Sequence, residues 1–204
     1  MPQSPIPYSA LARQFQSAPP GKIYCLTGAD SSVFRLSLSM ASQALLRGVP
    51  IAVVDGSNRF DAYMIAEAAR QITSDRSAGR RVTPEELLNR IFVARAFTCY
   101  QMEATITERL PAFLRRIQAP VAMVFGLLDT FYDDQAPLFE VKASVERIIL
   151  ALHRMKEDNI SLLLASKEIK VESKERNGLL PRLLSAMDHV YRMEQEGRGG
   201  RLVG

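Results

Sequence analysis

Short apolar runs alternate along this chain with longer segments in which apolar residues recur every three or four positions. A continuous aliphatic or β-branched run is typical of a parallel strand covered on both faces, whereas the longer period is typical of an amphipathic helix. The apolar runs predict strands at residues 23–26, 51–54, 91–94, 121–125 and 160–164. The periodic segments predict one helix capped by Ser31 or Ser32 and ended by Gly48, and further helices at residues 61–72, 83–90, 98–117, 141–156 and 179–184.

Individual residues refine several of these elements. The segment Thr83–Glu86 has the sequence of a capping box with proline in the first turn, which predicts a helix start at this point. Pro111 is expected to bend or restart the long helix. Residues 166–176 alternate in charge and predict a loop. In the helix at 61–72, the period predicts a buried stripe made of Tyr63, Ile65, Ala66, Ala69 and Ile72.

Strands that alternate with helices at this spacing predict an α/β fold with three layers, a mainly parallel central sheet, helices on both faces and right-handed crossovers. Near the C-terminus, residues 189–193 and 201–203 flank Glu196–Gly200, a hairpin signature that predicts antiparallel edge strands. Prolines near the start predict an N-terminal arm with a short helix at residues 1–20. A single core domain is predicted at residues 21–204.

The composition fits this architecture. Of the 204 residues, 47% are hydrophobic and 24% charged, which is enough apolar material for one globular core. No apolar run reaches the ~18 residues of a membrane span, and residues 1–20 have no apolar signal core, so we expect a cytoplasmic protein. Cys25 and Cys99 lie in apolar segments without metal-ligand spacing and are expected to be buried, reduced thiols.

Four phrases stand out in order along the chain: Pro19–Gly28, Ile51–Asp55, Val93–Phe97 followed by Gln101, and Val121–Tyr132. In this order they resemble the RecA-fold recombinase core, which includes the RadA-type recombinases, their paralogs and the KaiC-like ATPases. The resemblance covers nearly the whole chain, from residue 11 to residue 203. It implies a RecA-like three-layer fold without the separate N-terminal domain of the full recombinases.

The chain departs from this family at the phosphate cradle. A cradle of the type GxxxxGK[ST] needs a second glycine for close backbone approach, a lysine for the phosphate charge and a hydroxyl for Mg²⁺. Counted from Gly28, these places are held by Val33, Phe34 and Arg35. Asp30 adds a negative charge where phosphate oxygens would lie.

Three further catalytic positions of the family are also replaced. The stretch Asp55–Asn58 stands where the family has its water-activating glutamate, Gly126 stands near the Walker B aspartate, and Lys167 stands near the phosphate-sensing residue. Phosphoryl transfer depends almost entirely on positioning and charge stabilisation. The four departures together therefore predict a degenerate ATPase with no catalytic residues.

Two groups of residues remain as candidates for ligand binding. A vestigial nucleotide site would consist of Gly28, Ser31, Ser32, Arg35 and Lys167. The alternative is that Arg35 is an ordinary surface residue of its helix. A carboxylate set for a metal would consist of Asp55, Asp129, Asp133 and Asp134, although solvation of charged loops explains them more simply. We therefore expect no cofactor and no metal.

The net charge of +4 permits an anionic partner. Candidate nucleic-acid contacts are Arg76, Arg80, Arg81, Lys170, Lys174, Arg198 and Arg201. A solvated charged face is the simpler interpretation of each group, because two or three arginines give only weak, salt-dependent binding. The loop after the fourth strand is acidic, with Asp129, Asp133, Asp134 and Glu140, and would repel a phosphate backbone.

Two further features were considered, a possible docking motif and the two histidines, and neither predicts a functional site. Phe15–Ala18 matches the Phe-x-x-Ala pattern with which recombinases dock a neighbour, although its position beside the first strand favours a core phenylalanine. His153, interpreted as a helix-surface residue, and His189 show no pattern of a nucleophile with its base.

The resulting hypothesis is a catalytically inactive RecA-like domain that acts as a non-enzymatic, partner-binding subunit in DNA recombination or repair. The partner would be a RecA-fold protein or a second copy of the chain. The alternatives are a nucleotide-binding regulatory protein that senses ATP without hydrolysing it, and a weak single-stranded DNA binder.

Overall fold

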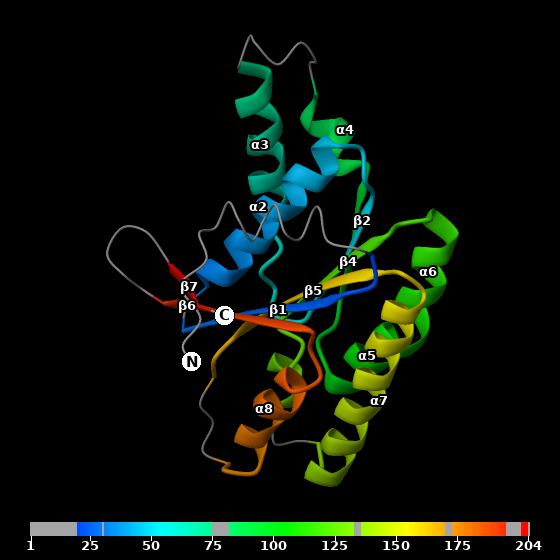
Figure 1. The fold of residues 1–204 in the computed structure, drawn as a ribbon, viewed down its shortest axis with the longest axis vertical. Helices are drawn as coiled ribbons and strands as arrows, with labels where there is room; N and C mark the ends of the chain where they lie inside the picture. The colour runs from blue at the N-terminus through cyan, green and yellow to red at the C-terminus, as the bar shows by residue number, and fades with distance from the viewer. Residues whose placement is uncertain are drawn as a thin grey trace.

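The computed structural model describes residues 20–29, 31–74, 82–132, 136–169, 173–194 and 201–203. These residues form one sheet between two layers of helices (Figure 1). The strands are β1 (Ile23–Gly28), β2 (Ile51–Asp55), β3 (Ile91–Arg95), β4 (Val121–Phe125), β5 (Ser161–Lys167), β6 (His189–Glu194) and β7 (Arg201–Val203). Their order across the sheet is β3-β2-β4-β5-β1-β6-β7.

The first six strands in this order are parallel, and β7 pairs antiparallel with β6. The predicted α/β class with a mainly parallel sheet is therefore confirmed, and the arrangement is consistent with a RecA-like three-layer fold. The predicted antiparallel hairpin is corrected in one respect, because β6 runs parallel to its neighbour β1. The turn at residues 195–200 and the N-terminal arm at residues 1–19 lie outside the described residues.

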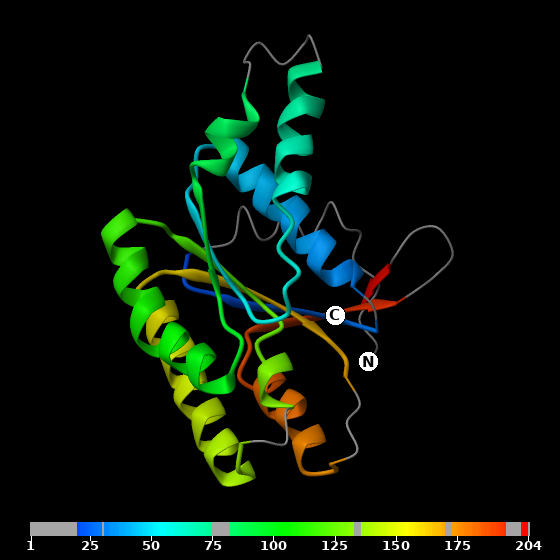
Figure 2. The same cartoon turned by 180° about the vertical axis from the view of Figure 1, so that it is seen from behind.

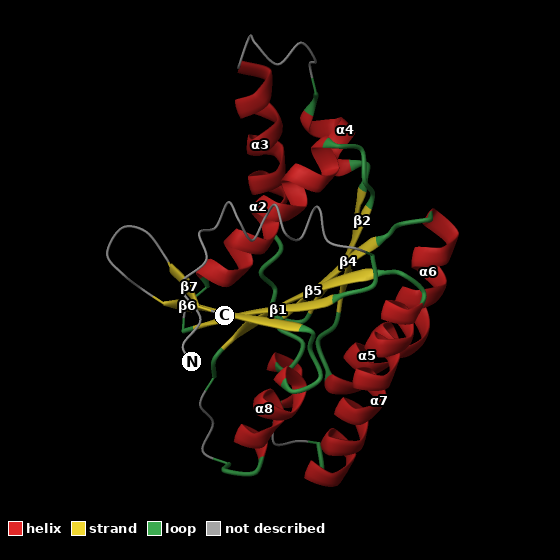
Figure 3. Ribbon diagram, viewed as in Figure 1, coloured by secondary structure: helices red, strands yellow, loops and turns green. Residues whose placement is uncertain are grey.

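The helices divide between the two faces of the sheet (Figures 2 and 3). One face is covered by α2 (Ser32–Leu46), α3 (Ala62–Ser74) and α4 (Pro84–Leu88). The other is covered by α5 (Cys99–Ala104), the π-helix Thr105–Arg109, α6 (Leu110–Ile117), α7 (Leu138–Glu157) and α8 (Leu179–Leu184). Two short 3₁₀ helices lie at Asp129–Phe131 and Arg176–Gly178. Within the described ranges, no helix combines the length and the apolar character needed to cross a membrane.

Each face of the sheet has its own apolar core, because successive side chains of a strand point to opposite sides. In β1, Tyr24 and Leu26 pack in the core beneath α2, whereas Ile23 and Cys25 pack in the core beneath α7. Cys25 is fully buried and reduced, as predicted, and burial raises the pKa of its thiol to about 12. This thiol is therefore protonated at neutral pH and chemically unreactive.

Two local predictions are confirmed with their cause. The Thr83 hydroxyl accepts a hydrogen bond from the Glu86 backbone N–H at 3.2 Å, and the Glu86 carboxylate accepts one from the Thr83 N–H at 3.1 Å. The long helix restarts at a π-helical turn that ends just before Pro111, whose ring nitrogen cannot donate a backbone hydrogen bond.

Two predictions are wrong. Tyr63 is 67% exposed, because α3 packs on α2 and α4 and its buried stripe is limited to Ile65, Ala66 and Ala69 among its described side chains. The predicted loop at residues 166–176 begins too early, because β1 and β5 remain paired as far as Gly28 and Lys167. Both strands therefore end at the same level, where the candidate site lies.

Candidate functional site

The carboxyl ends of β1, β2, β4 and β5 meet at one edge of the sheet, the usual ligand-binding edge of an open parallel sheet. The chain leaves β1 toward α2 on one face, while β5 leads to α8 on the other face. This divergence is the topological switch point of the fold. Gly28 and Lys167, two members of the predicted vestigial nucleotide site, lie opposite each other here on adjacent strands.

Two apolar residues, Val33 and Phe34, are buried at the sequence positions of the phosphate cradle. Val33 is fully buried and Phe34 is only 2% exposed. The Phe34 ring packs edge-on against Phe125 at the end of β4, with 5.7 Å between ring centroids. A Cβ placed on Gly28 would lie 3.0 Å from a methyl carbon of Val33 and 3.2 Å from the Cβ of Met193. Apolar side chains therefore pack closely against Gly28, the first residue of the phosphate-cradle phrase.

The other members of the predicted site differ in where they lie. Ser31 stands at the N-cap of α2 without a capping side-chain hydrogen bond, and the Ser32 hydroxyl lies 3.7 Å from the Met193 sulfur. Arg35 is exposed on α2, in agreement with the surface alternative. Asp30 lies outside the described residues.

Asp55, at the end of β2, holds the turn that follows it. Its side chain is 1% exposed and accepts hydrogen bonds from the backbone N–H groups of Ser57, Arg59 and Phe60 at 3.2, 3.1 and 2.9 Å. These hydrogen bonds fix the turn that follows β2. The prediction that loop solvation accounts for Asp55 is therefore wrong, because the side chain is buried and hydrogen-bonded.

Gly126, near the Walker B position, has no room for a side chain. Its φ of +57° is in the left-handed region, and a Cβ at this position would lie 2.8 Å from an Asp129 carboxylate oxygen. The carboxylate of Asp129, three residues further along, thus lies where a side chain at position 126 would begin. The Asp129 N–H donates to the Gly126 carbonyl at 3.1 Å, which fixes this turn.

Asp129 is a half-buried carboxylate in a mixed electrostatic environment. Burial raises its pKa to about 6, the nearby cations Arg59 and Lys167 act in the opposite direction, and Asp55 adds a smaller upward effect. Within the described residues, its Oδ1 and the neighbouring Thr130 hydroxyl are buried without a hydrogen-bond partner. Loop solvation therefore does not account for Asp129 either.

These residues do not form a recognisable metal centre. No group of three or more histidine, cysteine, aspartate or glutamate side chains in the described ranges is placed to hold an ion. Asp133 and Asp134, the other two members of the predicted carboxylate set, lie outside those ranges. The cations near Asp129 also disfavour a second positive charge at the same place.

The structure describes few of the predicted nucleic-acid contacts. Lys174 is exposed beside the exposed Glu175, so the local charge is mixed. For Arg201 the structure describes only the backbone, within β7. The remaining candidates, Arg76, Arg80, Arg81, Lys170 and Arg198, lie outside the described residues.

A second surface, which sequence reasoning missed, lies at the β3 edge of the sheet. Among the described strands, β3 pairs only with β2, and its residues after Ile91 are exposed, including Phe92 at 37% and Val93 at 39%. A cavity of about 260 Å³ opens beside this strand. Its lining comes from β2, β3, the π-helix and α6: Ala52, Val53, Val54, Phe92, Val93, Ala94, Arg95, Thr105, Arg109, Leu110 and Phe113.

Aromatic contacts join the two walls of this cavity, β3 and α6. Phe92 packs edge-on against Phe113 with 5.1 Å between ring centroids, and the Arg116 guanidinium lies 5.0 Å from the Phe113 ring. Thr105 and Arg109, the two ends of the π-helix, both line the cavity. The sequence analysis noted only the phrase Val93–Phe97 in this region. It did not identify β3 as an edge strand, because a local apolar pattern does not show which strands pair.

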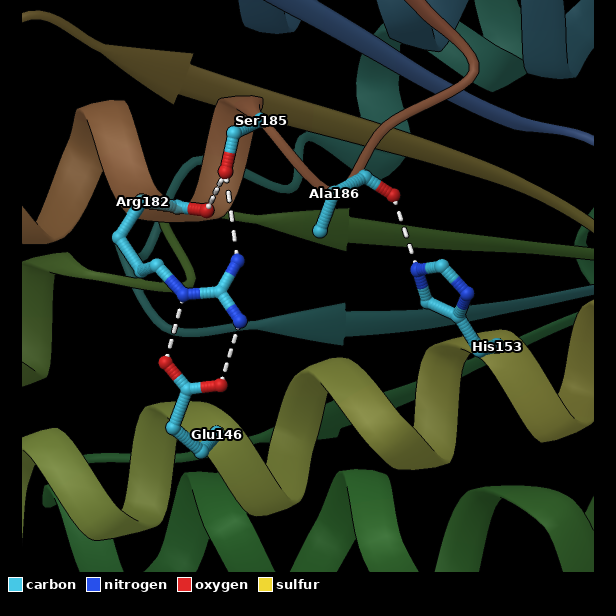
Figure 4. Close-up of polar contacts among 5 residues, drawn as sticks. All are labelled: Glu146, His153, Arg182, Ser185 and Ala186. Atoms are coloured by element: carbon cyan, nitrogen blue, oxygen red, sulfur yellow. Dashed lines mark hydrogen bonds and ion pairs between the residues drawn. The ribbon is translucent and has the colours of Figure 1, made fainter.

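His153 is not the helix-surface residue that the sequence predicted. It is half-buried, and its Nε2 lies 2.9 Å from the Ala186 carbonyl, which fixes the end of α8 against α7 (Figure 4). Arg182 on α8 forms a two-pronged ion pair with Glu146 on α7 and also contacts Ser185. These contacts dock two helices, and the hydroxyl of Ser185 is engaged with Arg182 while His153 contacts a backbone carbonyl, so they give no nucleophile–base pair.

Comparisons with known proteins do not place the chain in a family: no family model matches it, and no curated protein matches it.

Proposed function

We propose that this chain is a catalytically inactive RecA-like domain that acts by binding a partner, a RecA-fold protein in DNA recombination or repair. The resemblance of the four sequence phrases to the recombinase core supports the pathway. The parallel sheet and its strand order are consistent with that resemblance. Two places in the molecule support the partner-binding role: the positions of the phosphate cradle, where apolar residues are buried, and the exposed edge of β3.

The first place is the phosphate cradle. Catalysis of phosphoryl transfer requires a cation and backbone N–H groups aimed at the phosphate. Here Val33 and Phe34 are packed into the core at the corresponding place, and the Asp55 carboxylate is used by its own turn. These observations support a chain that does not turn over ATP.

The second place, the exposed edge of β3, is the observation that carries the proposal. An exposed edge strand presents unpaired backbone N–H and C=O groups and is a template for a strand of another chain. Edge strands are usually protected by charges or proline. In β3 the one charged residue, Arg95, stands at the end of the strand, and Phe92, Val93 and Ala94 are exposed beside the cavity. A cavity of about 150 Å³ can hold a benzene ring, so the larger volume of about 260 Å³ accommodates one aromatic or large aliphatic side chain.

The proposal is tested by placing a charge on this edge. Phe92→Asp is expected to weaken binding to a purified RecA-fold recombinase from the same organism by about tenfold or more, measured by biolayer interferometry. Tyr63→Asp is the matched control, because it charges an exposed aromatic side chain on α3, away from β3. Thermal unfolding of both variants checks that they fold. Equal binding by wild type and Phe92→Asp would exclude the β3 edge as the docking surface.

A nucleotide-sensing role is the second candidate, and one observation favours it. Lys167 and Gly28 lie side by side at the switch point of the sheet, where parallel α/β folds bind nucleotides. A sensor would show a rise in melting temperature with ATP, ADP or GTP and Mg²⁺. We expect no such rise, and a clear one that is lost in Lys167→Ala would favour the sensor.

A further inference from the structure

We propose that residues 126–132, which follow β4, open and close as one unit with the turn at residues 173–178, and that ionisation of Asp129 favours the open form. The form described by the structure is the closed one, and Arg176 holds it. This inference does not depend on the β3 edge or on the identity of a partner. A partner that binds only the open form would bind more weakly in acid than at neutral pH.

Two kinds of contact hold residues 126–132 in the closed form. Phe131 is fully buried, and the short 3₁₀ helix that carries it packs on α5. Arg176 is also buried, and its guanidinium donates to the carbonyls of Phe131 and Ala136, each at 2.6 Å. These acceptors lie 45 and 40 residues away from Arg176 in the sequence. The turn at residues 173–178 and the segment after β4 therefore separate only if these hydrogen bonds break.

The closed form also leaves polar groups of the same segment without partners. In the described part of the chain, three buried side-chain polar atoms have no hydrogen-bond partner, and two of them are Asp129 Oδ1 and Thr130 Oγ1. A buried polar atom without a partner is costly, and opening would expose it to water. The segment thus combines a buried aromatic anchor with two groups that gain from opening.

Charged groups at the ends of neighbouring strands act on Asp129. Burial is the main cause that raises its pKa, Arg59 and Lys167 lower it, and Asp55 raises it slightly. Burial, and then the nearby Asp129, raise the pKa of Tyr132 to about 12, so this phenol stays neutral from acid to neutral pH. The result for Asp129 is a pKa of about 6 in the closed form.

The direction of the pH effect follows from the two environments of Asp129. In the open form the carboxyl is solvated and has a pKa of about 3.9, whereas burial raises the pKa to about 6 in the closed form. The closed form is therefore fully favoured below a pH of about 4 and loses this advantage as pH rises from about 4 to about 6. A difference of about two pH units corresponds to a change of about a hundredfold in the opening equilibrium.

Hydrogen exchange of the full chain, with each rate divided by the intrinsic rate at the same pH, tests this switch. The reporters are the amides of Asp129, Phe131 and Asn177, each of which donates to a backbone carbonyl within its own segment. At a pH of about 7.5 we expect equal protection of the two segments, at least about tenfold lower than in β4 and β5. Protection as high as in these strands would mean that the segments open only on global unfolding, and would overturn the inference.

Asp129→Asn removes the charge and gives the sharpest test. At a pH of about 7.5 it should raise the protection of both segments by about tenfold to a hundredfold, and at a pH of about 4 it should agree with the wild type within about threefold. Asp158→Asn, at an exposed aspartate that precedes β5 at the opposite edge of the sheet, is the matched control and should change neither segment. A change confined to one segment, or one of equal size at both pH values, contradicts the proposal.

Arg176→Ala tests what holds the closed form. It should lower the protection of both segments by about tenfold or more, because two buried carbonyls lose their donors. Arg182→Ala, which removes an exposed ion pair on α8, should leave both segments unchanged. A folded Arg176→Ala protein with wild-type protection at Phe131 would show that the guanidinium does not hold the segment. If Arg176→Ala does not fold, the Asp129→Asn comparison decides the matter alone.

Discussion

Burial makes the ionised form of Asp129 unfavourable in the folded chain, which determines how this residue affects stability at different pH. The pKa of an aspartate in an unfolded chain is about 3.9, and burial raises the pKa of Asp129 in the fold to about 6. Because the folded pKa is the higher one, the neutral carboxyl stabilises the fold below the unfolded pKa. That contribution is lost as pH rises from about 4 to about 6.

Asp129→Asn is therefore expected to raise the free energy of unfolding by about 1–3 kcal/mol at a pH of about 7.5, where the wild-type carboxyl is charged. At a pH of about 4 the two proteins should be nearly equal, because the wild-type side chain is then neutral in the fold. Urea unfolding at both pH values measures the difference. A gain of the same size at both pH values would show that the charge of Asp129 is not the cause.

Arg176 is a second residue whose role follows from its burial. It is 5% exposed, and its guanidinium donates to the carbonyls of Phe131 and Ala136, both at 2.6 Å. These hydrogen bonds join the segment after β5 to the segment after β4. The sequence placed Arg176 in a charged loop and gave no sign of this contact, because its two acceptors are backbone atoms about forty residues away.

Arg176→Ala is expected to lower the free energy of unfolding by about 2–5 kcal/mol, since it leaves two buried carbonyls without these donors. Arg176→Lys should rescue little, because an ammonium cannot reach two carbonyls with the fork of a guanidinium. Arg182→Ala, which removes an exposed ion pair, should cost less than about 1 kcal/mol and is the control. Equal effects of Arg176→Ala and Arg182→Ala in urea unfolding would refute the role of the buried guanidinium.

At the scale of elements, the strands and helices were predictable from the spacing of their apolar residues, because the buried face of each element determines that spacing. The apolar runs gave β2 and β4 almost to the residue, and the Thr83 capping box gave the start of α4. The ends of β1 and β5 were missed, because Thr27 and Ser166 are polar yet buried. A strand continues through such residues when its neighbours remain paired, and pairing is not visible in a local pattern.

The α2 start offers a test of the closed cradle. Phe34→Lys would restore the lysine of the recombinase pattern, but it would place a cation at a site that is only 2% exposed. We expect a loss of about 3 kcal/mol or more in the free energy of unfolding. Thermal unfolding with and without Mg²⁺-ATP should show no stabilisation by the ligand. Stabilisation by ATP in this variant would mean that the cradle is still able to form.

At the scale of the whole molecule, the sequence predicted the loss of the nucleotide site but not the surface that replaces its function in our proposal. The sequence allowed this prediction because it concerns residue types at fixed spacing, such as Val33 and Phe34 after Gly28. The β3 edge was not visible, since being an edge depends on which strands pair. The cluster of Asp129, Arg59 and Lys167 was also hidden, because three separate strand ends bring it together.

The charges beside the β3 cavity predict the assembly state of the isolated chain. Arg95 and Arg109 line this cavity, and residues 1–29 contain no aspartate or glutamate. Because like charges repel, we expect a monomer in sedimentation velocity at low salt. The wild-type chain should then behave like Phe92→Asp, since neither would dimerise through β3. A dimer of the wild type that dissociates in Phe92→Asp would indicate self-association through this edge instead.

The aromatic packing of Phe34 on Phe125 also bears on timing. RecA-fold machines alternate between states because a bound triphosphate is consumed and replaced, so each cycle releases what the previous one held. On our proposal this domain does not turn over ATP, since the buried Phe34 stands where the family has its phosphate-binding lysine. On our proposal, how long it stays with its partner is then set by concentration and dissociation rate alone, and any directionality must come from the other protein.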